Sequence, residues 1–413
     1  MEKPQDTYQG PMNAEWFYSH THSFVSANKA HQLQQWKIAE ELYTNKLLEL
    51  APEFFPKFFS ALNTINVPTS NSQSDTSYDI NMARLNLAAC LMAQRKPTEH
   101  WQAFDVLLNI PESQRINGNE TETNKVVLVR TDQIGIGDIF HFLSAASHLK
   151  NRSGWKIILS IPHFLQQTLA SAAKEYGFTP ISAEDDQPAT DYQTHLISLL
   201  GLLKLPPHIL NPEKVMFTAP ERAINAVLEQ VTSALEQGNI IVVADRGKVG
   251  RQATLIGGKQ LPRNSSDHGR HLDSEPFNSL LRCHHNLTLM DCSNKNSRII
   301  VDDEHKKRYL TIANEEQPFD TIIALARIMS AKKGIVGFGP DMGQSNVFAR
   351  SLDHDAKNRM ALVIPNAKEH DMRMEGEGAV YKQMISNCWV YKCPTPNDQI
   401  KVIEQAYQHM LKY

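Results

Sequence analysis

Cysteine, long hydrophobic runs and net charge are all scarce in this chain of 413 residues. Its five cysteines argue against a disulfide-framed secreted protein and favour a reducing compartment. The N-terminus has no apolar core of a secretory signal, and no run of about 18 apolar residues occurs, so we expect a cytoplasmic protein without a transmembrane segment. A net charge of −3 offers no basic field for nucleic acid or an anionic membrane.

The first 118 residues are typical of a helical domain. Residues 15–50 contain almost no Gly or Pro, and apolar residues recur at helical spacing until Pro52. The segment 39–50 resembles the second helix of a tetratricopeptide repeat, and residues 80–94 and 99–109 resemble a second helical pair. The two units do not keep the repeat's spacing of roughly 34 residues. We therefore predict about two imperfect repeats, with a plain helical bundle as the alternative.

From residue 119 the pattern changes to alternating strands and helices. A continuous β-branched run at 125–130 is typical of a buried parallel strand. Further strands are expected at 156–161, 239–244, 287–292, 298–301, 334–338 and 361–365. Helices are expected at 139–149, 164–176, 220–237, 274–282, 320–331 and 397–411. Alternation of this kind predicts an α/β fold with parallel sheets and helices on both faces.

A Pro-containing break at 206–220 divides this α/β region. We predict two Rossmann-like domains, over residues 119–220 and 221–413, with the second ending in a helix. In such folds ligands bind at the carboxyl ends of the parallel strands. A ligand site is therefore expected in a cleft between the two domains.

The strongest candidate site is the Gly-rich turn after the strand at 125–130. Gly135 and Gly137 would let the backbone approach a ligand, and the amino terminus of the following helix favours negative charge. The turn lacks the third Gly of a dinucleotide fingerprint and the Lys of a P-loop. Asp138 would stand in the first helical turn, where a carboxylate can take a proton from a substrate hydroxyl. The alternative is that Asp138 only caps the helix.

A basic segment at 246–270 is the second candidate site. It contains six basic residues, one acidic residue and several glycines. Without a metal, Arg, Lys and backbone N–H groups are what stabilise a leaving diphosphate. We expect Arg246, Lys248 and Arg270 to bind one, with a solvated basic loop as the alternative.

These motifs together resemble a known family. Residues 137–141, which read Gly-Asp-apolar-apolar-His, are similar to the signature of glycosyltransferase family nine, the ADP-heptose:lipopolysaccharide heptosyltransferases. Residues 191–203, 269–280 and 319–338 resemble further family segments in the same order. Residues 341–346 are similar to the family's Asp-Thr-Gly-x-Ser-His donor motif. The resemblance covers roughly residues 125–410, and the family includes proteins with repeats fused at the N-terminus.

The resemblance implies a GT-B fold of two facing Rossmann-like domains. It implies an inverting transfer of a heptose or hexose from a nucleotide-diphosphate donor, with no cofactor and no metal site. Asp138 would be the general base, and Asp341 with the backbone of Gly343–Ser345 would lie near the donor. The remaining donor-site candidates are Gly135, Gly137, His141, Gln344 and Asn346. The acceptor would be a glycan or a protein, the latter recognised through the helical domain.

The donor motif departs from the family at two positions, because Met342 replaces Thr and Asn346 replaces His. An inactive scaffold, or a protein that binds a nucleotide sugar without turning it over, is therefore the alternative function. A different sugar-nucleotide enzyme on two Rossmann-like domains is a third, because fold alone does not decide among them.

Overall fold

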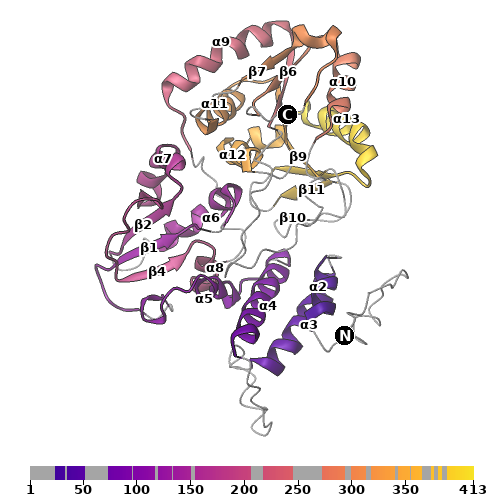
Figure 1. The fold of residues 1–413 in the computed structure, drawn as a ribbon. Coiled ribbons are helices and arrows are strands. Elements are labelled where there is room, and N and C mark those ends of the chain that lie inside the picture. Colours follow the sequence, from indigo (N-terminus) through magenta and orange to yellow (C-terminus); the bar gives the residue numbers. More distant parts are fainter. Residues whose placement is uncertain are drawn as a thin grey trace.

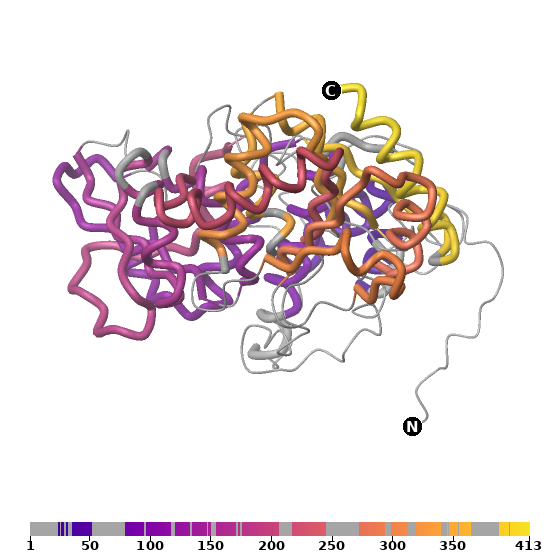
Figure 2. The backbone as a smooth tube through the Cα atoms, turned by 90° about the horizontal axis from the view of Figure 1, so that it is seen from above, coloured from indigo at the N-terminus to yellow at the C-terminus, as the bar shows by residue number. Residues whose placement is uncertain are grey.

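The computed structural model describes much of the chain, and Figures 1 and 2 show its arrangement. The described residues are 24–32, 35–51, 73–94, 96–116, 120–132, 134–149, 154–205, 217–244, 272–293, 299–312, 318–339, 343–353, 355–364, 374–375, 380–383 and 388–413. None of the helices in these ranges is long and apolar enough to cross a membrane.

The N-terminal part of the described chain is helical, as predicted. Helices α2 (Phe24–Gln32), α3 (Trp36–Leu50) and α4 (Gln73–Ala93) pack together around Tyr43 and Leu47 (Figure 1). The expected helix at 99–109 is instead a short 3-10 helix, η3 (Glu99–Gln102), followed by α5 (Ala103–Leu107). The pairing of these helices as tetratricopeptide repeats stays a prediction.

Helix α4 belongs to two cores at once. Leu87 and Cys90 face helices α2 and α3, whereas Ala88 and Met92 join the core that contains Val127 of the first sheet. Successive residues of a helix point in different directions, so a single helix buries both faces. The N-terminal helices are thus packed directly onto the α/β region.

The first sheet is entirely parallel among the described residues. It has the order β3-β2-β1-β4. Its strands are β1 (Val126–Arg130), β2 (Lys156–Ile161), β3 (Phe178–Ser182) and β4 (Tyr192–His195). The helices that follow its strands are α6 (Ile136–Leu149), α7 (Gln166–Tyr176) and α8 (Ser198–Leu202), with the 3-10 helix η5 (His163–Leu165) before α7. This sheet and its helices form the first lobe.

The second sheet has the order β10-β11-β12-β9-β8-β5-β6-β7. The strands from β12 to β7 in this order are parallel, and β10 and β11 add an antiparallel edge. The strands are β5 (Asn239–Val243), β6 (Leu287–Asp291), β7 (Tyr309–Thr311), β8 (Ile335–Gly339), β9 (Met360–Ile364), β10 (Met374–Glu375), β11 (Val380–Gln383) and β12 (Trp389–Lys392). With its helices, this sheet forms the second lobe.

Helices cover both faces of the second sheet (Figure 1). These helices are α9 (Glu221–Gln237), α10 (Ser274–Cys283), α11 (Pro318–Ala331), α12 (Gly343–Ser351) and α13 (Gln399–Met410). Side chains alternate along β5, so Ile240 and Val242 share a core with α9 and α11, whereas Ile241 and Val243 share one with α10 and α13. The predicted α/β alternation is confirmed.

The prediction of a strand at 298–301 is wrong. Residues 299–302 form no strand, and the sheet is extended instead by β7, after the 3-10 helix η9 (Asp303–Arg308). Side chains of α10 satisfy this backbone: Ile300 N–H donates to Ser274 Oγ at 2.9 Å, and the Ile300 carbonyl accepts from Asn278 Nδ2 at 2.9 Å. A backbone whose polar groups are already paired has no need of a neighbouring strand.

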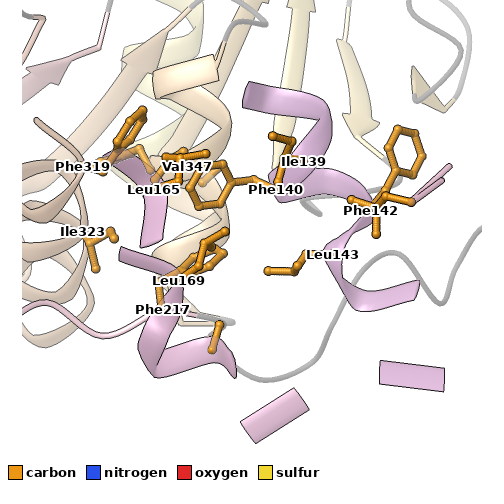
Figure 3. Packing of buried hydrophobic residues seen from close by; sticks show 14 of the residues in the cluster. Ile139, Phe140, Phe142, Leu143, Leu165, Leu169, Phe217, Phe319, Ile323 and Val347 are labelled. Carbon is orange, nitrogen blue, oxygen red and sulfur yellow. The ribbon is translucent and has the colours of Figure 1, made fainter. Parts of the chain in front are cut away.

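The two lobes share one hydrophobic core. Phe140 of α6 contacts Phe217 and Phe319 with ring centroids 4.8 and 5.8 Å apart. Figure 3 shows Phe140 near Val347 of α12. Arg350 of α12 donates from Nη2 to the carbonyl of His141 at 2.8 Å. Helices α6 and α12 therefore form the main contact between the lobes. The two lobes lie side by side in Figure 2.

Candidate functional site

Asp138 lies where the sequence predicts it, in the first turn of α6. The helix begins after the carboxyl end of β1, and the Ile139 N–H donates to the Gly135 carbonyl at 3.1 Å. The Asp138 side chain is half-buried, and Gly135 is exposed. A Cβ added at Gly135 would lie 3.2 Å from Asp138 Oδ2, so the carboxylate sits beside the turn. A side chain at residue 135 would crowd it.

The backbone that leads to Asp138 is held by three different side chains. Thr131 Oγ1 donates to the Ser160 carbonyl of β2 at 2.8 Å. The guanidinium of Arg130 binds both carboxylate oxygens of Asp132, at 2.9 and 2.7 Å. The ring Nε2 of His195, at the end of β4, lies 3.0 Å from the Asp132 carbonyl. The turn is thus tied to both neighbouring strands of β1.

His195 is fully buried, and its hydrogen bonds fix its tautomer. Ile197 N–H donates to His195 Nδ1 at 3.2 Å, so Nδ1 is the acceptor and Nε2 carries the proton. Nε2–H therefore donates to the Asp132 carbonyl. The ring stacks on Phe104 of α5, with centroids 4.7 Å apart and planes 10° from parallel. Burial lowers the pKa of His195 to about 4, so the imidazole is neutral at pH 7.

Asp105 of α5 anchors the same strand end. Its Oδ1 accepts from the His195 N–H at 2.7 Å, and its Oδ2 accepts from Thr194 Oγ1 at 3.0 Å. Burial raises the pKa of Asp105 to about 6, and these hydrogen bonds oppose the rise. No local sequence pattern marks this contact, because Asp105 stands in a helical segment 90 residues before its partner.

The second strand–turn–helix unit joins β8 to α12 in the other lobe. Ser345, in the first turn of α12, is fully buried, and its Oγ donates to the Ala244 carbonyl beyond the end of β5 at 2.7 Å. A Cβ added at Gly339 would lie 2.1 Å from Ser345 Oγ, so only glycine allows this approach. The carboxyl ends of β5 and β8 and the start of α12 are thus locked together.

Of the remaining predicted site residues, five lie in the described part of the chain and four lie outside it. His141 lies in α6 and is fully buried, and its backbone carbonyl accepts from Arg350 of the other lobe. Gly137 is half-buried beside Asp138. The structure places Gly343, Gln344 and Asn346 in the first turn of α12. Arg246, Lys248, Arg270 and Asp341 lie outside the described residues.

One group of possible metal ligands occurs in the described part of the chain. Side-chain atoms of Asp302, Glu304 and His305 lie within 4.8 Å of one another on and beside η9. Arg308 Nη2 lies 3.0 Å from His305 Nδ1, and a guanidinium can only donate. In the neutral ring Nε2 then carries the proton and has no lone pair for a metal. Arg282 also binds Asp302, so the group is better explained as an ion-pair cluster.

Comparisons with known proteins add distant structural likenesses. No protein-family model matches the sequence, and no curated protein matches it. A glycosyl transferase family 9 protein from Veillonella parvula is similar at 10% identity and a TM-score of 0.41, over 70% of this chain and 99% of that chain. The iron-containing dodecameric glycosyltransferase TibC from enterotoxigenic E. coli is similar at 8% identity and a TM-score of 0.34, over 71% and 75%. Because both TM-scores are below 0.5, these likenesses carry no argument about the fold or the site, which are described from this chain's own residues alone.

Proposed function

We propose that this chain is a glycosyltransferase that moves a sugar from a nucleotide-diphosphate donor to an acceptor hydroxyl. The observation that carries the proposal is the half-buried carboxylate of Asp138, beside Gly135 at the carboxyl end of a parallel strand. Ligands bind at such strand ends in parallel α/β sheets. The resemblance of residues 137–141 and 341–346 to motifs of glycosyltransferase family nine supports the same proposed activity.

In the proposed reaction Asp138 is the general base. It takes the proton of the acceptor hydroxyl as that oxygen attacks the anomeric carbon. The bond from the anomeric carbon to the diphosphate breaks on the opposite side, so the configuration inverts and the nucleoside diphosphate leaves with the electron pair. Arg246, Lys248 and Arg270 would stabilise that charge, together with the N–H groups at the start of α12. The reaction would then need no metal and no cofactor.

The acceptor is proposed to be a glycan or a protein that reaches Asp138 from the side of the N-terminal helices. Phe104 and Asp105 of α5 contact His195, which in turn contacts the turn before Asp138. An acceptor bound to these helices would therefore lie in a fixed relation to the base. The sugar is proposed to be a heptose or a hexose.

The test is a panel of nucleotide-diphosphate sugars, with binding measured by calorimetry and turnover by product detection, each with and without chelator. We expect one donor to bind and to be hydrolysed slowly in both conditions. Asp138→Asn should abolish turnover and leave donor binding within about threefold, because the amide keeps the shape but cannot take the proton. The matched control is Asp185→Asn, which makes the same change at an exposed position.

Each other outcome has a definite meaning. Asp138→Asn with wild-type turnover would show that Asp138 is not the base. Donor binding without turnover, even with a range of acceptors, would favour the inactive binding protein. No binding to any donor would favour the scaffold. Loss of turnover in chelator would contradict a reaction without metal.

A further inference from the structure

The turn that leads to Asp138 depends on a side chain from a different strand. β4 is one of the two hydrogen-bonded neighbours of β1, and His195 is the register partner of Arg130, the last residue of β1. The Leu196 N–H continues the pairing to the Arg130 carbonyl at 2.9 Å. Beyond that point the backbone pairing gives way to a side chain, because His195 Nε2–H reaches the Asp132 carbonyl at 3.0 Å.

From this arrangement we infer that His195 is a positioning residue for Asp138: its Nε2–H holds the Asp132 carbonyl and thereby sets the place of the turn that carries the carboxylate. The inference rests on the proposed function, in which Asp138 is the base. It names a residue that does not itself touch the reacting atoms.

Three further contacts leave the imidazole little freedom. Its Nδ1 is held by the Ile197 N–H, and one ring face is covered by Phe104. Its own backbone N–H is held by the buried carboxylate of Asp105. A donor fixed in this way has one orientation and one protonation state, which is what a supporting contact requires if it is to place a reacting group accurately.

Loss of this donor would act on Asp138 through the backbone. The Asp132 carbonyl would lose this donor, and the contacts of the Thr131 and Arg130 side chains would remain to hold the turn. A misplacement of about 1 Å in a reacting group can lower a rate by about 100-fold. Donor binding by groups other than Asp138 need not change, so the effect should fall on kcat rather than on KM.

Two variants of His195 with amide side chains test the roles of its two ring nitrogens separately. In His195→Gln the amide nitrogen can take the place of Nε2 and keep the donor to Asp132. In His195→Asn the shorter amide can keep an acceptor for the Ile197 N–H but does not reach Asp132. We expect His195→Asn to lower kcat by about 10- to 100-fold with the donor KM within about threefold of wild type, and His195→Gln to restore kcat to within about threefold.

Amide hydrogen exchange supplies a readout that needs no substrate. Peptides spanning residues 131–140 should exchange at least about tenfold faster in His195→Asn than in wild type, and near the wild-type rate in His195→Gln. Peptides from β8 and α13 serve as internal controls and should be unchanged. If His195→Asn does not fold, Phe104→Leu replaces it: it keeps both ring nitrogens but uncovers the ring face, and it should raise exchange in the same peptides.

The outcomes separate this inference from the proposed function. If His195→Gln is no better than His195→Asn, or if both behave as wild type in rate and exchange, His195 does not position the turn. An unchanged exchange rate in a folded Phe104→Leu, used where His195→Asn does not fold, would overturn it equally. If the exchange results are as expected but no donor is turned over by the wild-type protein, the proposed function fails and the support of the turn by His195 stands.

Discussion

As the pH falls, the ionisation of Asp105 and that of His195 should change the free energy of unfolding in opposite directions, although the two residues are in contact. Burial lowers the pKa of His195 from its ordinary value of 6.5 to about 4. Between pH 4 and pH 6.5 the unfolded chain binds a proton at His195 that the folded chain does not bind. The contribution of His195 is thus fully present above pH 6.5 and is lost as the pH falls. From pH 7 to pH 5 the loss is about 2 kcal/mol.

Asp105 works in the other direction. Burial raises its pKa from 3.8 to about 6, so the folded chain takes up a proton before the unfolded chain does. Its contribution is fully present below pH 3.8 and is lost as the pH rises through 6. From pH 7 to pH 5 the gain is about 1 kcal/mol. In the wild-type protein this gain offsets part of the loss from His195.

Urea unfolding of the wild type, two variants and a control variant at pH 7 and pH 5 tests both signs. Relative to wild type, His195→Gln should lose about 2 kcal/mol less on acidification, and Asp105→Asn should lose about 1 kcal/mol more. Taking the difference from wild type cancels the groups that the variants share. Exposed His163→Gln is the matched control and should follow the wild-type profile. The reasoning is refuted if His195→Gln keeps the wild-type pH dependence or if both variants shift in the same direction.

Three other predictions concern packing and the turn. A Cβ at Gly201 would lie 2.7 Å from the Glu99 carbonyl oxygen, so Gly201→Ala must part α8 from η3 and should cost about 1–3 kcal/mol in urea unfolding. Among the described residues, the Cβ of Gly135→Ala would meet the movable Asp138 side chain, at 3.2 Å, so this variant should lower donor turnover with a smaller loss of stability. Phe140→Ala should cost about 3–5 kcal/mol. Because the lobes share that core, circular dichroism and tryptophan fluorescence should still report one unfolding transition.

The strands that the sequence predicts correctly are those with continuous apolar runs. β2, β5, β6, β8 and β9 each bury nearly every residue, and β1 buries its three central residues. Such runs are visible without any knowledge of neighbouring strands. β3 contains Pro180 and half-exposed positions at a sheet edge, and β4 is a short mixed segment. Those two are strands because β2 and β1 pair with them, which is information that the local sequence does not hold.

The candidate site divides in the same way. Asp138 follows a strand and a Gly-containing turn within a few residues, so its place in the first helical turn is a local property and is confirmed. The contacts that support it are not local. His195 is about 60 residues away from Asp132, and Asp105 is a lone carboxylate in a helical segment that would ordinarily be assigned to the surface.

The long-range contacts also change what the N-terminal helices can do. A repeat module joined by a linker would carry its ligand at a variable distance from the catalytic groups. Here α4 contributes to the core of the first sheet, and α5 supplies both Phe104 and Asp105 to the end of β4. Burying the Asp105 carboxylate costs stability near pH 7, yet its hydrogen bonds hold α5 and β4 in one arrangement with the turn before Asp138. The helices are therefore better understood as part of the framework that supports the turn before Asp138 than as an appended module.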